Sequence, residues 1–408
     1  MQTENKTSYT PQPTLRVQGL KPSAVFQVLQ KAEILKKQGK DIVSLSIGEP
    51  EWGTFDIIKS AGIKAIQEDY TKYTSAAGRE KLRSQLSLQA EKDLGIPFGP
   101  ENVTITAGCK YALFTLFQCF CNPGDEVILP APYWVSYPNI MELCGAKCIT
   151  VPTDESSGFK ITASQLKKSL TNKTKIFLLN SPNNPTSAVY SSEELKALGD
   201  VLKDHPQVLV ITDDIYNRIV FEGDSAPHIL NFCSFLKNRT FAVNGGSKSY
   251  LMTGWRIAWI IGPKNLIKTL SSFQSQTISC ANSISQKALE DSLLASEESI
   301  IQFREKLREL RDSFFNQMSQ IPGLKPHPSE GGFYLWVGVK DLIGRKYQGE
   351  PITSSLDLME KLLEKANLLC LSGESFGAPG YLRFNYAVKP DSLNKAIQRL
   401  SQFVSELT

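Results

Sequence analysis

Short β-rich runs alternate with longer helical patterns along much of this chain. Runs of apolar and β-branched residues predict six strands, at 102–106, 126–130, 175–179, 208–212, 240–244 and 257–261. Helical periodicity covers residues 192–205 and 265–277, and a long amphipathic pattern covers residues 302–320. This alternation predicts an α/β protein with a mostly parallel sheet flanked by helices.

The chain is too long for one hydrophobic core. Its 408 residues predict a large domain and a smaller one. Residues 331–339, 354–368 and 381–388 carry enough strand and helix signal for a smaller α+β domain. We place an N-terminal arm and part of the small domain in residues 1–50, the large domain in 51–300 and the small C-terminal domain in 301–408. Residues 5–14 are expected to form a mobile arm.

Charge, targeting signals and cysteines narrow the function classes. A net charge of +4, from 45 basic and 41 acidic residues, is too slight for a nucleic-acid-binding surface. The N-terminal stretch resembles neither a secretory signal nor a transit peptide, and no apolar run is long enough for a membrane span. The eight cysteines and three histidines lack zinc-site spacing, so we expect reduced thiols, no metal and a cytoplasmic location.

Polar residues directly follow several of the predicted strands. Ligands of open α/β sheets bind outside the carboxyl ends of parallel strands, so these positions are the candidates for a site. The strand at 102–106 runs into Gly108, Cys109 and Lys110, where backbone N–H groups at the start of a helix could hold a phosphate. A plain strand-to-helix turn is the alternative, and no dinucleotide or P-loop glycine motif is present.

Two further strands lead into amide and carboxylate side chains. Asn184 in "NSPNNPTS" precedes a proline that restricts it, so its amide could donate to a ligand, although such asparagines also bond their own loops. The strand at 208–212 ends in Asp213 and Asp214. A buried aspartate needs a cation, for which a protonated ring nitrogen would suit Asp213, whereas we expect Asp214 to cap the following helix.

Lys248 lies in "NGGSKSYLMTGWR", behind two glycines and a serine. It is either a solvated surface residue or a nucleophilic amine whose pKa is lowered by burial and by nearby cations such as Arg256. A phosphate cradle, a partner for a ring nitrogen, donors to a ring oxygen and a lysine together make up a pyridoxal phosphate site.

From about Leu15 to the C-terminus the chain resembles the class I aminotransferases, a pyridoxal-phosphate family typified by aspartate aminotransferase. The stretches that carry the resemblance, in order, are "KPSAVF", "SIGEPEWGT", "KYTSAAGREKLR", "TAGCKYALFTLF", "PGDEVILPAPYWVSYPNI", "NSPNNPTSAVY", "TDDIYNRIVF", "NGGSKSYLMTGWRIAWIIGP", "EGGFYLW" and "YLRFNYA". They are most similar to the bacterial aspartate and prephenate aminotransferase branch. The resemblance implies a seven-stranded large domain and a homodimer with shared active sites.

The resemblance assigns the ring-binding roles. Lys248 would bind the cofactor as a Schiff base and later move the α-proton. Asp213 would keep the pyridine nitrogen protonated, while Asn184 and Tyr216 would donate hydrogen bonds to the ring oxygen. Trp134 would stack on the ring face.

The resemblance also assigns residues to the phosphate. The backbone of Gly108 and Cys109 would hold it together with the guanidinium of Arg256, and Ser247 would lie nearby. Tyr73 would reach the phosphate in the neighbouring subunit.

Substrate contacts follow from the same resemblance. Arg383 would bind the α-carboxylate bidentately, assisted by the backbone of Gly48. Trp134 and Asn184 would also face the substrate, and Lys110 would meet a distal carboxylate.

Three positions depart from the family pattern. Gly245 stands where many members have a serine that touches the phosphate, Ser187 stands where glycine is common, and Val25 replaces a threonine of some aspartate-preferring relatives.

These features imply ping-pong transamination, with aspartate and 2-oxoglutarate as the expected substrates. Aromatic amino acids, prephenate and kynurenine remain alternative substrates, and a β-lyase would keep the same cofactor residues. We do not expect a regulatory protein, because only about fifteen residues precede the similar region and such a protein would need an added DNA-binding segment.

Overall fold

A seven-stranded sheet, here called the large sheet, forms the centre of the molecule. The computed structural model describes residues 11–18 and 24–408. The strand order is β2-β8-β7-β6-β5-β3-β4. The bounds are β2 Val103–Thr106, β3 Glu126–Ala131, β4 Lys147–Pro152, β5 Thr174–Asn180, β6 Leu209–Asp213, β7 Thr240–Gly245 and β8 Ala258–Ile261. Only β8 runs antiparallel to its neighbours, so the predicted mostly parallel α/β sheet and its six predicted strands are confirmed.

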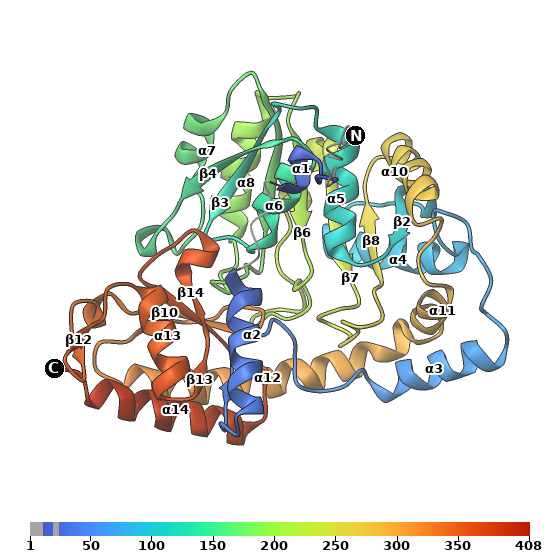
Figure 1. The fold of residues 1–408 in the computed structure, drawn as a ribbon. Coiled ribbons are helices and arrows are strands. Elements are labelled where there is room, and N and C mark those ends of the chain that lie inside the picture. Colours follow the sequence, from blue (N-terminus) through green and yellow to red (C-terminus); the bar gives the residue numbers. More distant parts are fainter. Residues whose placement is uncertain (1–10, 19–23) are drawn as a thin grey trace, which may run out of the picture.

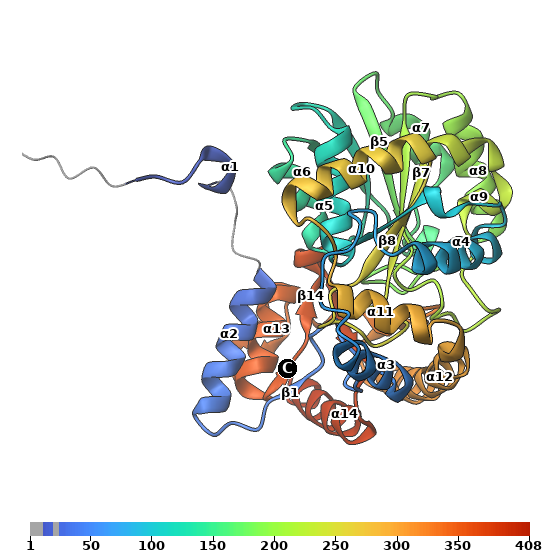
Figure 2. The same ribbon diagram turned by 90° about the vertical axis from the view of Figure 1, so that its right-hand side faces the viewer.

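Helices cover both faces of the large sheet, as Figures 1 and 2 show. One face packs against α5 (Cys109–Phe120), α6 (Ser136–Leu143) and α10 (Lys264–Thr277). The other packs against α4 (Glu80–Leu94), α7 (Ala163–Ser169), α8 (Ser192–Lys203) and α9 (Ile229–Phe232). Neighbouring residues of β5, Phe177 and Leu178, enter different cores because strand side chains alternate. Burial on both faces explains why these strands are continuous apolar runs in the sequence.

The strand β4 was not predicted from the sequence. It forms one edge of the large sheet and pairs only with β3. Of its residues only Val151 is buried, so the segment lacks the apolar run that marks the central strands.

A second, four-stranded antiparallel sheet, here called the small sheet, has the order β14-β15-β10-β9. Its strands are β9 Lys325–His327, β10 Tyr334–Gly338, β14 Leu371–Ser372 and β15 Tyr381–Asn385. Two short pairs accompany it, β1 (Val43–Ser44) with β13 (Leu368–Leu369) and β11 (Lys346–Tyr347) with β12 (Glu350–Pro351). The helices around it are α2 (Ala24–Lys37), α13 (Ser355–Lys365) and α14 (Pro390–Ser405). The predicted smaller α+β part is confirmed, while the boundaries at residues 50 and 300 stay a prediction.

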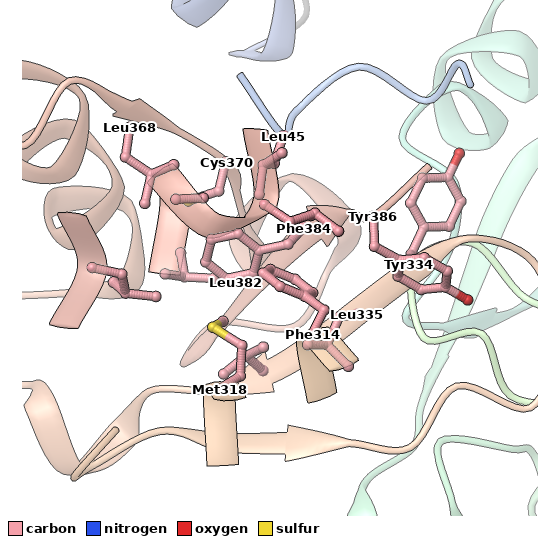
Figure 3. Packing of buried hydrophobic residues seen from close by; sticks show 14 of the residues in the cluster. Leu45, Phe314, Met318, Tyr334, Leu335, Leu368, Cys370, Leu382, Phe384 and Tyr386 are labelled. Carbon is pink, nitrogen blue, oxygen red and sulfur yellow. The ribbon is translucent and has the colours of Figure 1, made fainter. Parts of the chain in front are cut away.

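The helix α12 (Glu297–Ser319) runs beneath both parts of the molecule (Figure 1). Ile300 in its first turn belongs to a core of the large sheet. From Phe303 onward, its buried side chains belong to the core of the small sheet. Figure 3 shows Phe314 and Met318 of this helix packed against Leu382 and Phe384. One helix therefore joins the two cores.

The remaining helices lie outside these layers. They are α1 (Leu15–Gln18), α3 (Asp56–Gln67) and α11 (Ser283–Ser292), of which α3 packs on α11. Most of the expected mobile arm, residues 5–10 of 5–14, lies outside the described residues. Within the described ranges, no helix combines the length and the apolar character that crossing a membrane requires.

Candidate active site

A cavity of about 400 Å³ lies between the carboxyl edge of the large sheet and the small sheet. Among the predicted site residues, all except Gly108 and Tyr73 line it. The loop after β5, the end of β6 and the loop after β7 bring Asn184, Asp213 and Lys248 to the same edge, because parallel strands end there together. The sequence-based expectation that these strand ends converge is therefore confirmed.

Lys248 extends its amine toward the first segment of the chain. Its Nζ donates to the carbonyl oxygen of Gly48 over 2.6 Å. Burial lowers the pKa of the Lys248 amine to about 8, and the positive charges of Arg383 and Arg256 act in the same direction. A lysine with this pKa is neutral in a large fraction of molecules near pH 8, so it can act as a nucleophile and as a base.

Asp213 is the buried acid at the bottom of the cavity. Tyr137 of α6 donates from its hydroxyl to Asp213 Oδ2 over 2.7 Å, and Asn180 Nδ2 donates to the Asp213 carbonyl oxygen. Burial raises the pKa of the Asp213 carboxyl group to about 6, while the bond from Tyr137 opposes that rise. Such a carboxylate gains from a cationic partner in the cavity.

The expectation that Asp214 caps a helix was wrong. No helix begins directly after β6, and the next one, α9, starts at Ile229. The Asp214 carboxylate instead accepts a hydrogen bond from Thr212 over 2.8 Å, and burial raises its pKa well above the usual value. It lies behind the site and does not line the cavity.

Arg383 projects from β15 of the small sheet and is 3% exposed. Its Nη1 donates to Asn184 Oδ1 over 2.9 Å, and its Nη2 donates to the carbonyl oxygen of Ser46. The guanidinium carbon lies 4.3 Å from the ring centroid of Tyr334. Its Nε is buried and has no hydrogen-bond partner within the described part of the chain. Arg383 lines the cavity, and a guanidinium in a cavity wall is suited to an anionic ligand.

Gly108 and Arg256 form a cradle for an anion. Gly108 has a φ of +90° and caps α5, which begins at Cys109 and so directs free N–H groups outward. A Cβ atom on Gly108 would lie 2.4 Å from Arg256 Nη2, so only glycine allows the guanidinium this close. Arg256 Nη1 donates to the carbonyl oxygen of Thr253, which fixes the guanidinium there.

Trp134 and Lys110 form the outer wall. The Trp134 ring meets the Tyr137 ring edge to face, with centroids 5.3 Å apart. Lys110 Nζ lies 5.0 Å from the Trp134 ring centroid. Burial lowers the pKa of the Lys110 amine, and Arg256 adds to that effect.

Tyr73 does not reach this cavity. Its side chain is 89% exposed, and it lies outside the lining of the cavity of its own chain. Its predicted contact is with a neighbouring subunit and stays a prediction.

Among the lining residues that the sequence analysis did not single out are two tyrosines, Tyr137 and Tyr334. Tyr137 lies three residues after Trp134, in the first turn of α6, and this short spacing from a predicted site residue was a usable signal. Tyr334 is fully buried in β10, where sequence alone marks only a core residue.

The structure also accounts for two departures from the family pattern. A Cβ atom on Gly245 would lie 2.9 Å from the carbonyl oxygen of Ile257, so a serine does not fit this backbone. Ser187 adopts a φ of +61° and donates its hydroxyl to the Tyr334 carbonyl oxygen over 2.8 Å. The third departure, Val25, has a side chain outside those described.

The residues present fit pyridoxal phosphate. The cradle of Gly108 and Arg256 suits its phosphate, the acid Asp213 suits its ring nitrogen, and the amine of Lys248 suits its aldehyde. Arg256, Asp213 and Lys248 all line the same cavity, and Gly108 lies directly beside Arg256.

Comparison with known proteins agrees with this geometry. A family model described as aminotransferase class I and II matches residues 40–400. A Nitrosomonas europaea protein named aspartate/prephenate aminotransferase is 40% identical, covering 96% of this chain and 99% of the relative. An aspartate aminotransferase of Geobacillus stearothermophilus is 37% identical, covering 95% of this chain and 98% of the relative.

Solved structures show the same fold. The aspartate aminotransferase of Rhizobium meliloti superposes with a TM-score of 0.95 at 35% identity, covering 98% of this chain and all of that one. The aspartate aminotransferase of Thermus thermophilus with maleate gives a TM-score of 0.89 at 34% identity, covering 97% of this chain and all of that one. The chain therefore belongs to the class I and II aminotransferase family, and it is a pyridoxal-phosphate-dependent enzyme that transfers amino groups between amino acids and oxo acids.

Proposed function

We propose that this aminotransferase transfers the amino group of aspartate to 2-oxoglutarate in two half-reactions. The observation that carries this choice is that two cationic side chains, Arg383 and Lys110, line the same cavity. A dicarboxylic amino acid offers one carboxylate to each. The planar guanidinium of Arg383 suits the α-carboxylate, and the ammonium of Lys110 suits the side-chain carboxylate as a point charge.

Pyridoxal phosphate, when bound, supplies an aldehyde that condenses with amines and a ring that accepts an electron pair. In our proposal Lys248 binds it covalently and, once released, moves the proton at the substrate Cα. Its pKa of about 8 supports both roles. Asp213 holds the proton on the ring nitrogen.

Asn184 and Tyr216 donate to the ring oxygen in this proposal. Arg383 donates to Asn184 Oδ1, which leaves the Nδ2 end of that amide as a donor for the cofactor. Trp134 covers the ring, and the backbone of Gly48 helps to hold the substrate.

The phosphate is held by the backbone of Gly108 and Cys109 and by the side chains of Ser247 and Arg256. Tyr73 completes this group from a second subunit, so we propose a homodimer with shared active sites. The 89% exposure of Tyr73 in a single chain supports this arrangement. A cytoplasmic location is part of the proposal, because we expect the eight cysteines to be reduced thiols.

The proposal is tested with a panel of amino donors and 2-oxoglutarate, measuring glutamate together with the oxo acid formed from each donor. Aspartate should give the highest kcat/KM. The Lys110→Ala variant should raise the KM for aspartate by about fivefold, since an ion pair contributes on the order of 1 kcal/mol, and should leave the KM for alanine unchanged. An equal effect on both donors would contradict the role of Lys110. Pyruvate and ammonia from a cysteine conjugate would instead identify a β-lyase.

Prephenate is a second candidate as the oxo-acid acceptor. The relative from Nitrosomonas europaea is named aspartate/prephenate aminotransferase. Prephenate also carries two carboxylates, so it matches the same pair of cations. Including it in an acceptor panel with aspartate as the donor decides between these acceptors.

A further inference from the structure

Tyr334 reaches the site from β10 of the small sheet. Its hydroxyl oxygen lies 2.8 Å from that of Tyr216, and its ring lines the cavity. We propose that Tyr334 is a positioning residue: its hydroxyl donates to the Tyr216 oxygen and thereby directs the Tyr216 proton toward the ring oxygen of bound pyridoxal phosphate. This inference rests on the role proposed above for Tyr216.

The direction of the hydrogen bond follows from the number of protons. Each tyrosine hydroxyl has one proton to donate and can accept as well. Among the described residues, the Tyr334 hydroxyl has one recorded hydrogen-bond partner, the hydroxyl of Tyr216. If Tyr216 gave its proton to Tyr334, it would have none for the cofactor. Donation from Tyr334 to Tyr216 satisfies both hydroxyls once the cofactor accepts from Tyr216.

The Tyr334 ring is held in place on several sides. The backbone carbonyl oxygen of Tyr334 accepts hydrogen bonds from the hydroxyls of Ser187 and Ser329. The Arg383 guanidinium lies over the ring, and a Cβ on Gly48 would lie 2.7 Å from the hydroxyl oxygen. These contacts fix the backbone of Tyr334 and place its ring against Arg383, with the hydroxyl close to Gly48 and Tyr216.

Burial makes the alignment of these protons important. Tyr334 is 0% exposed and Tyr216 is 3% exposed, so water does not replace a lost partner. In such surroundings, one hydroxyl that accepts a hydrogen bond becomes a stronger donor in its next one. The charged groups that face the pair are Arg383 on β15, Asp213 at the end of β6 and Lys248 after β7. None of the variants below replaces one of these three residues.

The test is the pH midpoint at which the visible absorption of the bound cofactor changes. Donors to the ring oxygen weaken its hold on a neighbouring proton, so removing them should raise the midpoint. We expect Tyr216→Phe to raise it most and Tyr334→Phe to raise it by about half a pH unit, the value of one modest hydrogen bond. The double variant should match Tyr216→Phe alone, because Tyr334 acts through Tyr216.

Tyr386 provides a matched control. It is another fully buried tyrosine, and Figure 3 shows it at the same end of the cluster as Tyr334. Its hydroxyl donates to the Gly332 carbonyl oxygen over 3.1 Å, and it does not line the cavity. Tyr386→Phe also removes one buried hydroxyl, so it should lower the thermal stability to a similar degree without moving the midpoint.

A second variant separates the hydroxyl from the ring. Tyr334→Leu should give the same midpoint shift as Tyr334→Phe, and it should also raise the KM for amino acids because Arg383 loses the ring beneath it. An unchanged midpoint in both variants, or an equal shift in the Tyr216→Phe background, would overturn the inference. If Tyr216→Phe itself leaves the midpoint unchanged, the role proposed for Tyr216 fails instead.

Discussion

The two sheets contribute to the cavity in different ways. The large sheet supplies groups at the ends of its strands: Asp213 ends β6, and Lys248 follows β7. The small sheet supplies groups from the middle of its strands, where Arg383 of β15 projects into the cavity. Strand ends present separate loops, whereas a strand interior presents side chains that are held by neighbouring strands.

The difference separates two tasks. In our proposal the loops of the large sheet surround the cofactor, and the small sheet binds the substrate carboxylate. The bond between Arg383 and Asn184 links the two groups across the cavity. Variants of Lys248 and Asp213 on the large sheet should therefore change the cofactor and its spectrum, and variants of Arg383 on the small sheet should change the KM for substrates. Tyr334 is the exception on the small sheet, because its hydroxyl contacts Tyr216.

The largest expected effect is that of Lys248→Ala. It should lower kcat by about 10⁴-fold or more, because both the covalent attachment and the acid–base group are lost. The bound cofactor should also lose its visible absorption band. Lys287, another buried lysine that pairs with Asp291 on α11, gives the control: Lys287→Ala should keep the band. Turnover retained by Lys248→Ala would contradict the assignment.

Two adjacent acids give the next comparison. Asp213→Asn should lower kcat by about 10³-fold, because the ring nitrogen loses its acidic partner. Asp214→Asn should change kcat by less than about threefold, because Asp214 does not line the cavity and the amide oxygen of asparagine can still accept the hydrogen bond from Thr212. The measurement is single-turnover kinetics of both variants. An equal loss of kcat in both variants would contradict the assignment of the ring-nitrogen partner to Asp213.

Arg383→Lys should act on substrate binding. We expect the KM for every amino acid to rise by about a hundredfold, since a bidentate contact is replaced by a point charge. The absorption of the cofactor should stay near that of the unchanged protein. Arg399→Lys, on α14 beside Asp41, is the control for the same exchange away from the cavity. An altered spectrum with an unchanged KM would break the proposed division between the sheets.

The smallest expected effect is that of Tyr137→Phe. Its hydroxyl bond stabilises the charged form of Asp213, so its loss should raise the pKa of that carboxyl group above about 6. When the cofactor-free variant is titrated with pyridoxal phosphate, the affinity should fall at a higher pH than in the unchanged protein. The reason is that Asp213 loses its negative charge at a higher pH in the variant. The expected rise in the acid midpoint is about half a unit. A titration of cofactor binding between pH 5 and about 8 measures it.

The central architecture and four convergent loops could be predicted from the sequence. Strands buried on both faces are continuous apolar runs, and polar residues at their ends mark the site. The edge strand β4 was missed because only Val151 of its residues is buried. The long helix α12 begins at Glu297, five residues before the predicted start at 302, because its first turn is polar except for Ile300 and Ile301.

Residues on the small sheet were harder to predict. Arg383 was assigned by family resemblance alone, since nothing in "YLRFNYA" distinguishes it from a surface arginine. Tyr334 could be recognised as a site residue only from the structure, which places its hydroxyl beside that of Tyr216. Asp214 was assigned to a helix cap because the sequence does not show that a loop follows β6.

The course of α12 limits how the enzyme can open. The start of α12, at Ile300, packs in a core of the large sheet, and the rest of the helix packs in the core of the small sheet. The helix therefore couples the movements of the two cores. Sliding of the small sheet would pull Phe314 and Met318 out of their packing, whereas tilting keeps these contacts. We therefore expect the small sheet to tilt about the Ile300 end of α12, and not to slide along it, when Arg383 approaches or leaves a substrate.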